Sequence, residues 1–171
     1  EFSERLAATF DLRKQSRSQE TSALTKDGIE LRANVSVTFA LDPGDQVSHR
    51  ETPEERDILH HARITPAFPF NPDSAFKAYY GFAVNDKQEL VKWLDLPIIV
   101  ACEYFRDLIS KNNLDDLFQP KDLQSTPLSA LQTRLTDMVQ KAGLLKDRGI
   151  KVYSVSVGTP ELSPEVNQKR L

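Results

Sequence analysis

The chain has 171 residues, of which 39% are hydrophobic and 27% are charged, and these are the proportions of an ordinary folded domain with a buried core. A net charge of −3 offers no basic surface for nucleic acid or anionic lipid, so we expect no nucleic-acid partner. The single cysteine, Cys102, excludes an internal disulfide and fits a reducing compartment. No apolar run approaches the ~18 residues that a membrane span requires.

The N-terminal part of the chain predicts two strands and a turn. Apolar and polar residues alternate at its start, and the apolar ones are Leu6, Ala8, Phe10 and Leu12. This pattern predicts a half-buried strand. Residues 17–26 alternate poorly, which favours a strand near a sheet edge. Asp27-Gly28 then predicts a tight hairpin turn, because both residue types tolerate positive φ.

The strongest pattern in the chain follows this turn. Polar residues, with Ala40 as the one exception, separate a row of apolar ones: Ile29, Leu31, Ala33, Val35, Val37, Phe39 and Leu41. A period of two over thirteen residues predicts a long strand with one apolar and one polar face. Entered through a hairpin, such a strand predicts an antiparallel sheet with one face in water.

Residues 44–95 contain a cluster of aromatic residues. Thr52-Pro53 is typical of a helix start, and six aromatic residues lie within fifteen positions: Phe68, Phe70, Phe76, Tyr79, Tyr80 and Phe82. Two interpretations stay open. The aromatic residues form a small core that holds this segment against the sheet, or they form a contact surface for a partner or a second subunit. In both cases we expect helical, proline-bounded segments folded onto the domain.

Helix signals dominate the second half of the chain. Asp95 followed by Pro97 predicts a helix whose buried face carries Ala101, Phe105, Leu108 and Ile109. Thr126-Pro127 predicts another with the apolar row Leu128, Leu131, Leu135, Met138 and Ala142, which Gly149 would end in the left-handed conformation. Residues 150–157 predict a β-branched strand, and Ser163-Pro164 predicts a last helix. Strands, then helices, then a strand indicate an α+β fold with an antiparallel sheet.

No constellation of residues predicts catalysis, a cofactor or a metal. The three histidines are His49, His60 and His61, and no paired cysteines or HExxH motif accompany them. Cys102 lies among apolar residues, which predicts a buried structural thiol. Acidic residues at Asp45, Glu54-Glu55 and Asp115-Asp116 are typical of helix N-termini, where the helix dipole favours negative charge.

Several segments, which occur in the same order as in the family, resemble the stomatin–prohibitin–flotillin superfamily, also called SPFH or band-7 domains. They are Asp11-Leu12-Arg13-Lys14-Gln15, Leu24-Thr25-Lys26-Asp27-Gly28, Asp42-Pro43, Phe105 to Ile109 with Asn113 to Phe118, Arg148 to Val152, and Leu162 to Val166. The resemblance covers roughly the whole chain. It implies one SPFH-like domain over residues 1–171, with a strongly twisted sheet packed with several helices and a C-terminal helix from about residue 163. The segment at about 44–95 departs from the family pattern.

The resemblance also implies a function. We expect a non-enzymatic, membrane-associated scaffold that homo-oligomerises, organises membrane patches and modulates membrane proteins such as proteases or channels. Glu1-Phe2 at the start and Asn167 to Leu171 at the end favour a domain excised from a longer protein. The domain itself would be soluble, on the cytoplasmic side, with its anchor elsewhere in that protein. Two alternatives stay open: a soluble domain that binds a peptide or ligand through the aromatic segment, and an enzyme with a site in the same segment.

Overall fold

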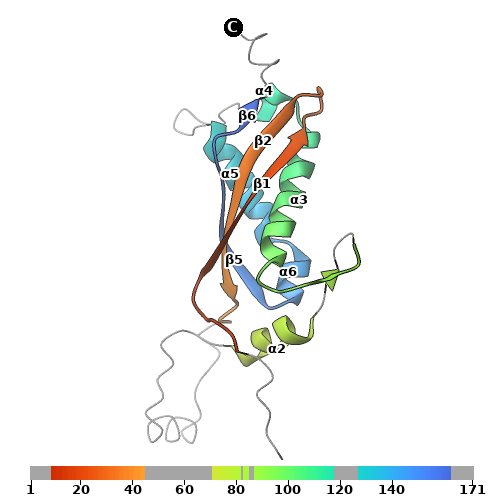
Figure 1. Cartoon of the computed structure of the whole chain (residues 1–171). Coiled ribbons are helices and arrows are strands. Elements are labelled where there is room, and N and C mark those ends of the chain that lie inside the picture. Colours follow the sequence, from red (N-terminus) through yellow and green to blue (C-terminus); the bar gives the residue numbers. More distant parts are fainter. Residues whose placement is uncertain (1–8, 45–70, 82, 85–86, 118–126, 163–171) are drawn as a thin grey trace, which may run out of the picture.

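The computed structural model describes residues 9–44, 71–81, 83–84, 87–117 and 127–162. Within them the chain forms an α+β fold in which helices pack against an open antiparallel sheet (Figure 1). The strands are β1 Gln15–Leu24, β2 Glu30–Leu41, β3 Ala83–Val84, β4 Leu90–Val91, β5 Ile150–Val157 and β6 Glu161–Leu162. The helices are α2 Pro72–Tyr80, α3 Leu96–Ser110, α4 Leu114–Leu117, α5 Pro127–Gln140 and α6 Gly143–Asp147. The sequence-based fold class is therefore confirmed at this level.

The sheet is built around β2, which lies between β1 on one side and β5 and β6 on the other. β1 and β2 form a long twisted hairpin (Figure 1), and Gly28 in its turn has φ +81, as the Asp27-Gly28 signal predicts. The Thr25 hydroxyl accepts from the Ile29 N–H at 2.9 Å and donates to Asp27 at 2.5 Å. The edge position predicted for residues 17–26 is also confirmed, because β1 pairs only with β2 among the described strands.

The first predicted strand is wrong within the described residues. Thr9 to Lys14 form no strand, and β1 begins only at Gln15. The alternation is real, but Asp11 and Arg13 bind each other instead, with two guanidinium–carboxylate contacts of 2.9 and 2.7 Å. The Asp11 carboxylate also accepts from the backbone N–H of Arg13 at 3.0 Å, and a local bond of this kind offers the backbone an alternative to the ladder of a sheet.

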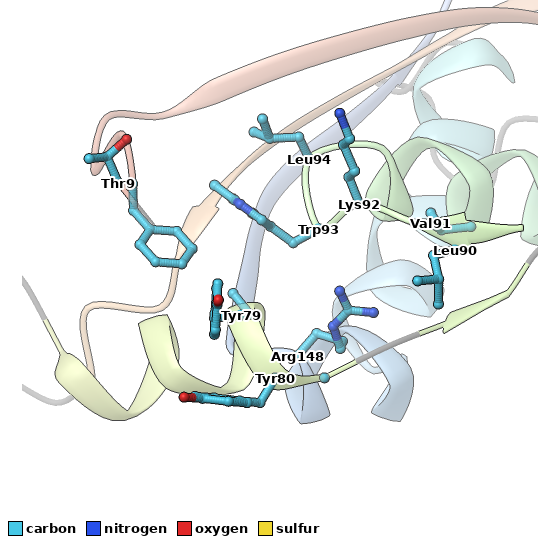
Figure 2. Close-up of a pocket in the computed structure, with 12 residues that line it drawn as sticks. Thr9, Tyr79, Tyr80, Leu90, Val91, Lys92, Trp93, Leu94 and Arg148 are labelled. Atoms are coloured by element: carbon cyan, nitrogen blue, oxygen red, sulfur yellow. The ribbon is translucent and has the colours of Figure 1, made fainter. Parts of the chain in front are cut away.

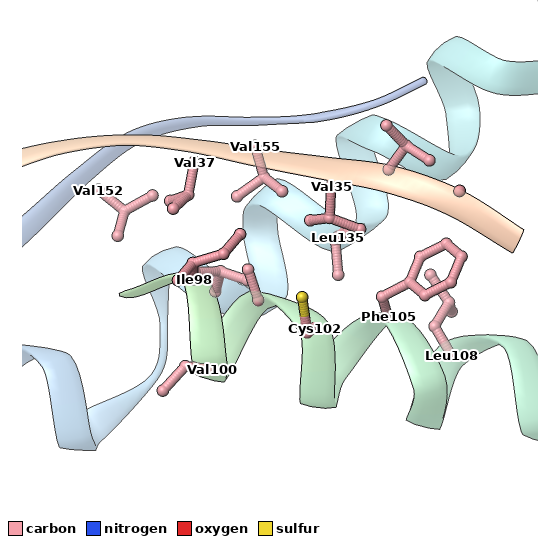
Figure 3. Packing of buried hydrophobic residues seen from close by; sticks show 14 of the residues in the cluster. Val35, Val37, Ile98, Val100, Cys102, Phe105, Leu108, Leu135, Val152 and Val155 are labelled. Atoms are coloured by element: carbon pink, nitrogen blue, oxygen red, sulfur yellow. The ribbon is translucent and has the colours of Figure 1, made fainter. Parts of the chain in front are cut away.

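The core lies between one face of the sheet and helices α3 and α5 (Figure 3). The odd-numbered row of β2 is buried, whereas its even-numbered residues are exposed or half-buried up to Thr38, with Ser36 bonded to Ser18 at 2.6 Å; Ala40 is the buried exception. The predicted inner face of α3 is buried as well, from Ala101 through Ile109. The predicted buried thiol of Cys102 is confirmed, since this side chain has no exposed surface.

The prediction for the end of the next helix is wrong in its details. α5 starts at Pro127 as predicted, but it ends at Gln140, and the short α6 separates it from Gly149. Gly149 does adopt the left-handed conformation, with φ +67. It joins α6 to β5, which covers residues 150–157 as the sequence predicts.

Side chains of α5 form hydrogen bonds with the backbone groups on the outer edge of β5. The Thr136 hydroxyl bonds both the carbonyl and the N–H of Val155, at 3.0 and 3.2 Å. Gln132 accepts from the Val157 N–H at 2.9 Å, and Gln140 donates to the Val152 carbonyl at 3.2 Å. Because these bonds occupy the groups that another strand would need, α5 closes this edge of the sheet.

Candidate functional site

α2 begins where its sequence supplies a start signal. The Asn71 side chain accepts from the Asp73 N–H at 3.1 Å, and Pro72 occupies the first helical position, where its missing N–H has no cost. At the other end the Gly81 N–H donates to the Lys77 carbonyl at 2.8 Å. The expectation of a helical, proline-bounded element within residues 44–95 is confirmed for this helix, while Thr52-Pro53 lies outside the described residues.

Two glycines allow α2 to approach the α6–β5 connection closely. A Cβ at Gly149 would lie 2.5 Å from the Ser74 carbonyl oxygen, and one at Gly81 would lie 2.4 Å from Cδ of Arg148. Both distances are shorter than real carbon contacts allow. Ser74 and Ala78 form the buried face of the helix, each only 4% exposed. α2 is therefore seated at the end of the sheet opposite the β1–β2 turn (Figure 1).

The opposite face of α2 carries three exposed aromatic side chains. Phe76 is 61% exposed, Tyr79 45% and Tyr80 63%. Ring centroids lie 4.5 Å apart for Phe76 and Tyr80 and 4.7 Å apart for Tyr79 and Tyr80. We call these three residues the aromatic cluster. Their exposure favours the contact-surface interpretation over the small-core one, and that interpretation stays a prediction.

The other three aromatic residues of the predicted surface, Phe68, Phe70 and Phe82, lie outside the described residues.

A cavity of about 480 Å³ opens beside the aromatic cluster (Figure 2). Tyr79 and Tyr80 form one wall, and the segment from Leu90 to Leu94 forms another. Phe10 closes a further side, with its ring 6.0 Å from that of Trp93. Trp93 in turn meets Phe39 of the core edge-on at 6.1 Å, so this wall is fixed to the main body of the domain.

Arg148 lines the same cavity and is only 4% exposed. Figure 2 shows its guanidinium among Tyr79, Tyr80 and the segment from Leu90 to Trp93. Its Nε and Nη1 atoms are buried without a hydrogen-bond partner within the described part of the chain. Burial lowers the pKa of the Arg148 guanidinium, since an apolar environment disfavours its charge. Buried cations are ordinarily paired, which makes this side chain the least satisfied polar group of the site.

The cavity combines apolar walls with two cationic side chains. Among the described residues that line it, Lys92 and Arg148 are cationic and none is a carboxylate. The remaining wall is mainly aromatic and aliphatic. Such a pairing of apolar walls with one or two placed charges is typical of ligand sites of this size.

The other sequence candidates are dispersed. Burial raises the pKa of the Cys102 thiol, which disfavours the reactive thiolate. Asp115 and Asp116 lie in the first turn of α4, as predicted, whereas Asp45, Glu54-Glu55 and the histidines lie outside the described residues. In the described ranges no group of three acidic, histidine or cysteine side chains is arranged to hold a metal.

Sequence reasoning missed Arg148, Trp93 and Phe10. Trp93 and Phe10 are apolar residues near strands and helices, and they carry no signal that distinguishes a cavity wall from a core. Arg148 begins the family-like segment Arg148 to Val152, but a sequence does not indicate which charged side chain will be buried. The Arg-Gly pair at 148–149 is the one available hint, since the glycine permits a close approach of a second element.

No protein-family model matches the chain, and no curated protein matches it. The SPFH resemblance therefore stays a prediction. In the part of the chain that the structure describes, none of the helices has both the length and the apolar character needed to cross a bilayer.

Proposed function

We propose that this chain is a non-enzymatic assembly module of the SPFH type, which homo-oligomerises and serves a membrane-associated scaffold. Its further partners would be membrane proteins such as proteases or channels, as the sequence resemblance implies. The α+β architecture, with a twisted β1–β2 hairpin, the long helix α3 and the late strand β5, is compatible with this proposal.

The observation that carries the proposal is the aromatic cluster of α2. Large aromatic side chains dominate the binding energy of protein interfaces because each buries much area at little entropic cost. Phe76, Tyr79 and Tyr80 expose about half or more of their surface on a helix that is firmly seated by its other face. A rigid, exposed aromatic surface of this kind favours a contact with another protein over a role in stability.

The test compares assembly of the full-length gene product with and without the aromatic cluster. The double variant Tyr79→Ser/Tyr80→Ser should reduce the size of the particles that mild detergent extracts from membranes, as measured by light scattering. The matched control is Leu24→Ser/Leu144→Ser, which removes two apolar side chains of similar exposure, 60% and 46%, from β1 and α6. This control should leave the particle size unchanged.

A monomeric wild-type protein would contradict the scaffold proposal. Equal particle sizes for the wild type and the tyrosine variant would instead place the assembly contact elsewhere on the surface. A normal circular-dichroism spectrum and melting temperature for the tyrosine variant ensure that a smaller particle reflects a lost contact and not a lost fold.

A further inference from the structure

Arg148 is the one cation that the described fold buries without a hydrogen-bond partner at Nε and Nη1. Arg148 is held from two sides: Gly81 packs against its Cδ and Nε atoms, and Gly149 fixes the following turn against Ser74. Burial lowers the pKa of its guanidinium. The acids Asp73, Asp147 and Asp42 raise the pKa of Lys77.

We infer that the cavity beside α2 is a binding site for a small organic monoanion, such as a carboxylate with an aromatic or branched apolar body. Arg148 would hold the anionic group, and the rings of Tyr79, Tyr80 and Trp93 would hold the body. This site shares Tyr79 and Tyr80 with the assembly surface proposed above, but its anionic group depends on Arg148, which the assembly proposal does not use.

The charge of the ligand follows from the number of buried cations. One buried guanidinium compensates one negative charge, and a planar carboxylate matches the fixed fork of guanidinium donors. The second negative charge of a phosphate dianion would have only Lys92 as a partner. Lys92 is exposed at the rim, so its charge is screened by water. A monoanion is the better match.

The size and character of the body follow from the walls. A volume of about 480 Å³ lies in the range of roughly 300–1,000 Å³ that small-molecule sites occupy. The walls from Phe10, Leu90, Trp93 and the two tyrosines present rings and branched side chains, so an apolar body would gain contacts that water cannot supply. A free inorganic anion would contact only Arg148 and would leave these apolar walls exposed to water.

Trp93 is the only tryptophan of the chain and lines the cavity, so its fluorescence reports on occupancy directly. The experiment titrates the protein with phenylbutyrate and with phenylbutyramide, which have the same body and differ in charge. Acetate serves as the anionic group without a body. We expect phenylbutyrate to bind at least about tenfold more tightly than the amide, the factor that one charge-assisted hydrogen bond supplies, and acetate to give no saturable change.

Variants assign the preference to the proposed residues. Arg148→Met keeps the apolar stem beside Gly81 and should reduce the acid-to-amide preference to within about twofold, while Arg148→Lys should retain part of it. Tyr80→Ala, at an exposed position, should weaken acid and amide by the same factor. If Arg148→Met does not fold, the acid-to-amide ratio in the wild-type protein decides the proposal without it.

Three results would overturn the proposal. Equal affinities for the acid and the amide would show that the site does not recognise the anionic group. A preference for the acid that survives in Arg148→Met would place that group elsewhere. The absence of any saturable change in Trp93 fluorescence with either probe would show that the cavity does not bind such a body. Particle size does not enter these measurements, so failure here is separate from failure of the assembly proposal.

Discussion

Two regions of the molecule follow opposite rules of burial. In the body formed by the sheet with α3 and α5, apolar side chains such as Val35 and Phe105 are fully buried and charges lie outside. Around α2 the arrangement is inverted: Phe76 and Tyr80 are more than 60% exposed, while Arg148 is 4% exposed. The first arrangement lowers the free energy of the isolated domain, and the second does not.

This difference indicates what each region is for. Burying apolar area is the main favourable contribution to folding, so the body needs no partner to explain it. An exposed aromatic cluster and an unpaired buried cation both raise the free energy of the isolated chain. Groups that are unsatisfied in the free protein are the ones that a bound partner or ligand can satisfy.

The largest expected effect is the introduction of a charge into the body. Val35→Asp puts a carboxylate at a position with no exposed surface, where it finds no counter-charge. We expect a loss of about 4 kcal/mol or more in the free energy of unfolding, measured by urea denaturation.

The adjacent residue is the control for this prediction. Ser36 lies on the outer face, half-buried beside Ser18, so a carboxylate there stays hydrated. Ser36→Asp should cost no more than about 1 kcal/mol. Similar midpoints for the two variants would contradict the register of β2 and with it the assignment of its two faces.

The second prediction concerns the close contact between α2 and the α6–β5 connection, where the two regions meet. Gly149→Ala forces an alanine into φ +67 and drives its Cβ toward the Ser74 carbonyl. We expect a loss of about 2 to 3 kcal/mol, because the left-handed backbone alone costs roughly 1 to 2 kcal/mol. Hydrogen exchange should show faster exchange in α2 than in α3, since only α2 is displaced.

Gly143→Ala is the matched control, because its added Cβ would meet nothing within 4 Å. It lies in α6, where alanine is the better helix former, so stability should stay equal or rise by up to about 1 kcal/mol. Protection of α2 that persists in Gly149→Ala would argue against the tight seat of this helix.

The body of the domain was largely predictable from the sequence. Strict alternation in β2 and helical spacing in α3 each identify a buried face without any tertiary information, and Asp27-Gly28 identifies the turn. The predictions that were wrong concern segments where local signals compete. The alternating residues Thr9 to Leu12 form no strand, and Gly149 follows α6 instead of α5 because the extended backbone at Ala142 interrupts the helical row first.

The candidate site was only partly predictable. Clustering in the sequence identified Phe76, Tyr79 and Tyr80, but their exposure depends on which face of α2 meets the α6–β5 connection. The burial of Arg148 depends on residues far apart in the chain, Gly81 on one side and Trp93 on another. No sequence periodicity predicts contacts between residues so far apart in the chain, so only the folded structure shows that Arg148 is buried.

A third, smaller effect is expected at the edge of β5. Thr136→Val keeps the shape of the side chain but removes the hydroxyl that bonds the N–H and carbonyl of Val155. Leaving these groups unsatisfied should cost about 1 to 2 kcal/mol, measured by thermal or urea denaturation. Thr133→Val on the same helix is the control, because Thr133 is exposed and bonds only the Ser129 carbonyl. It should change stability by no more than about 0.5 kcal/mol, and an equal loss in both variants would contradict a specific role for Thr136.

The smallest expected effect distinguishes the two regions most clearly. Arg148→Met removes a buried charge that has no partner in the described residues and keeps an apolar stem against Gly81. Replacing a buried charge by an apolar side chain of similar volume is often neutral or stabilising, so we expect stability to stay unchanged or to rise by up to about 1 kcal/mol. Arg134→Met, at an exposed position of α5, is the control and should be neutral. If Arg148→Met instead lost more than about 2 kcal/mol, Arg148 would have a stabilising partner within the chain, and the α2 region would follow the same rule as the body.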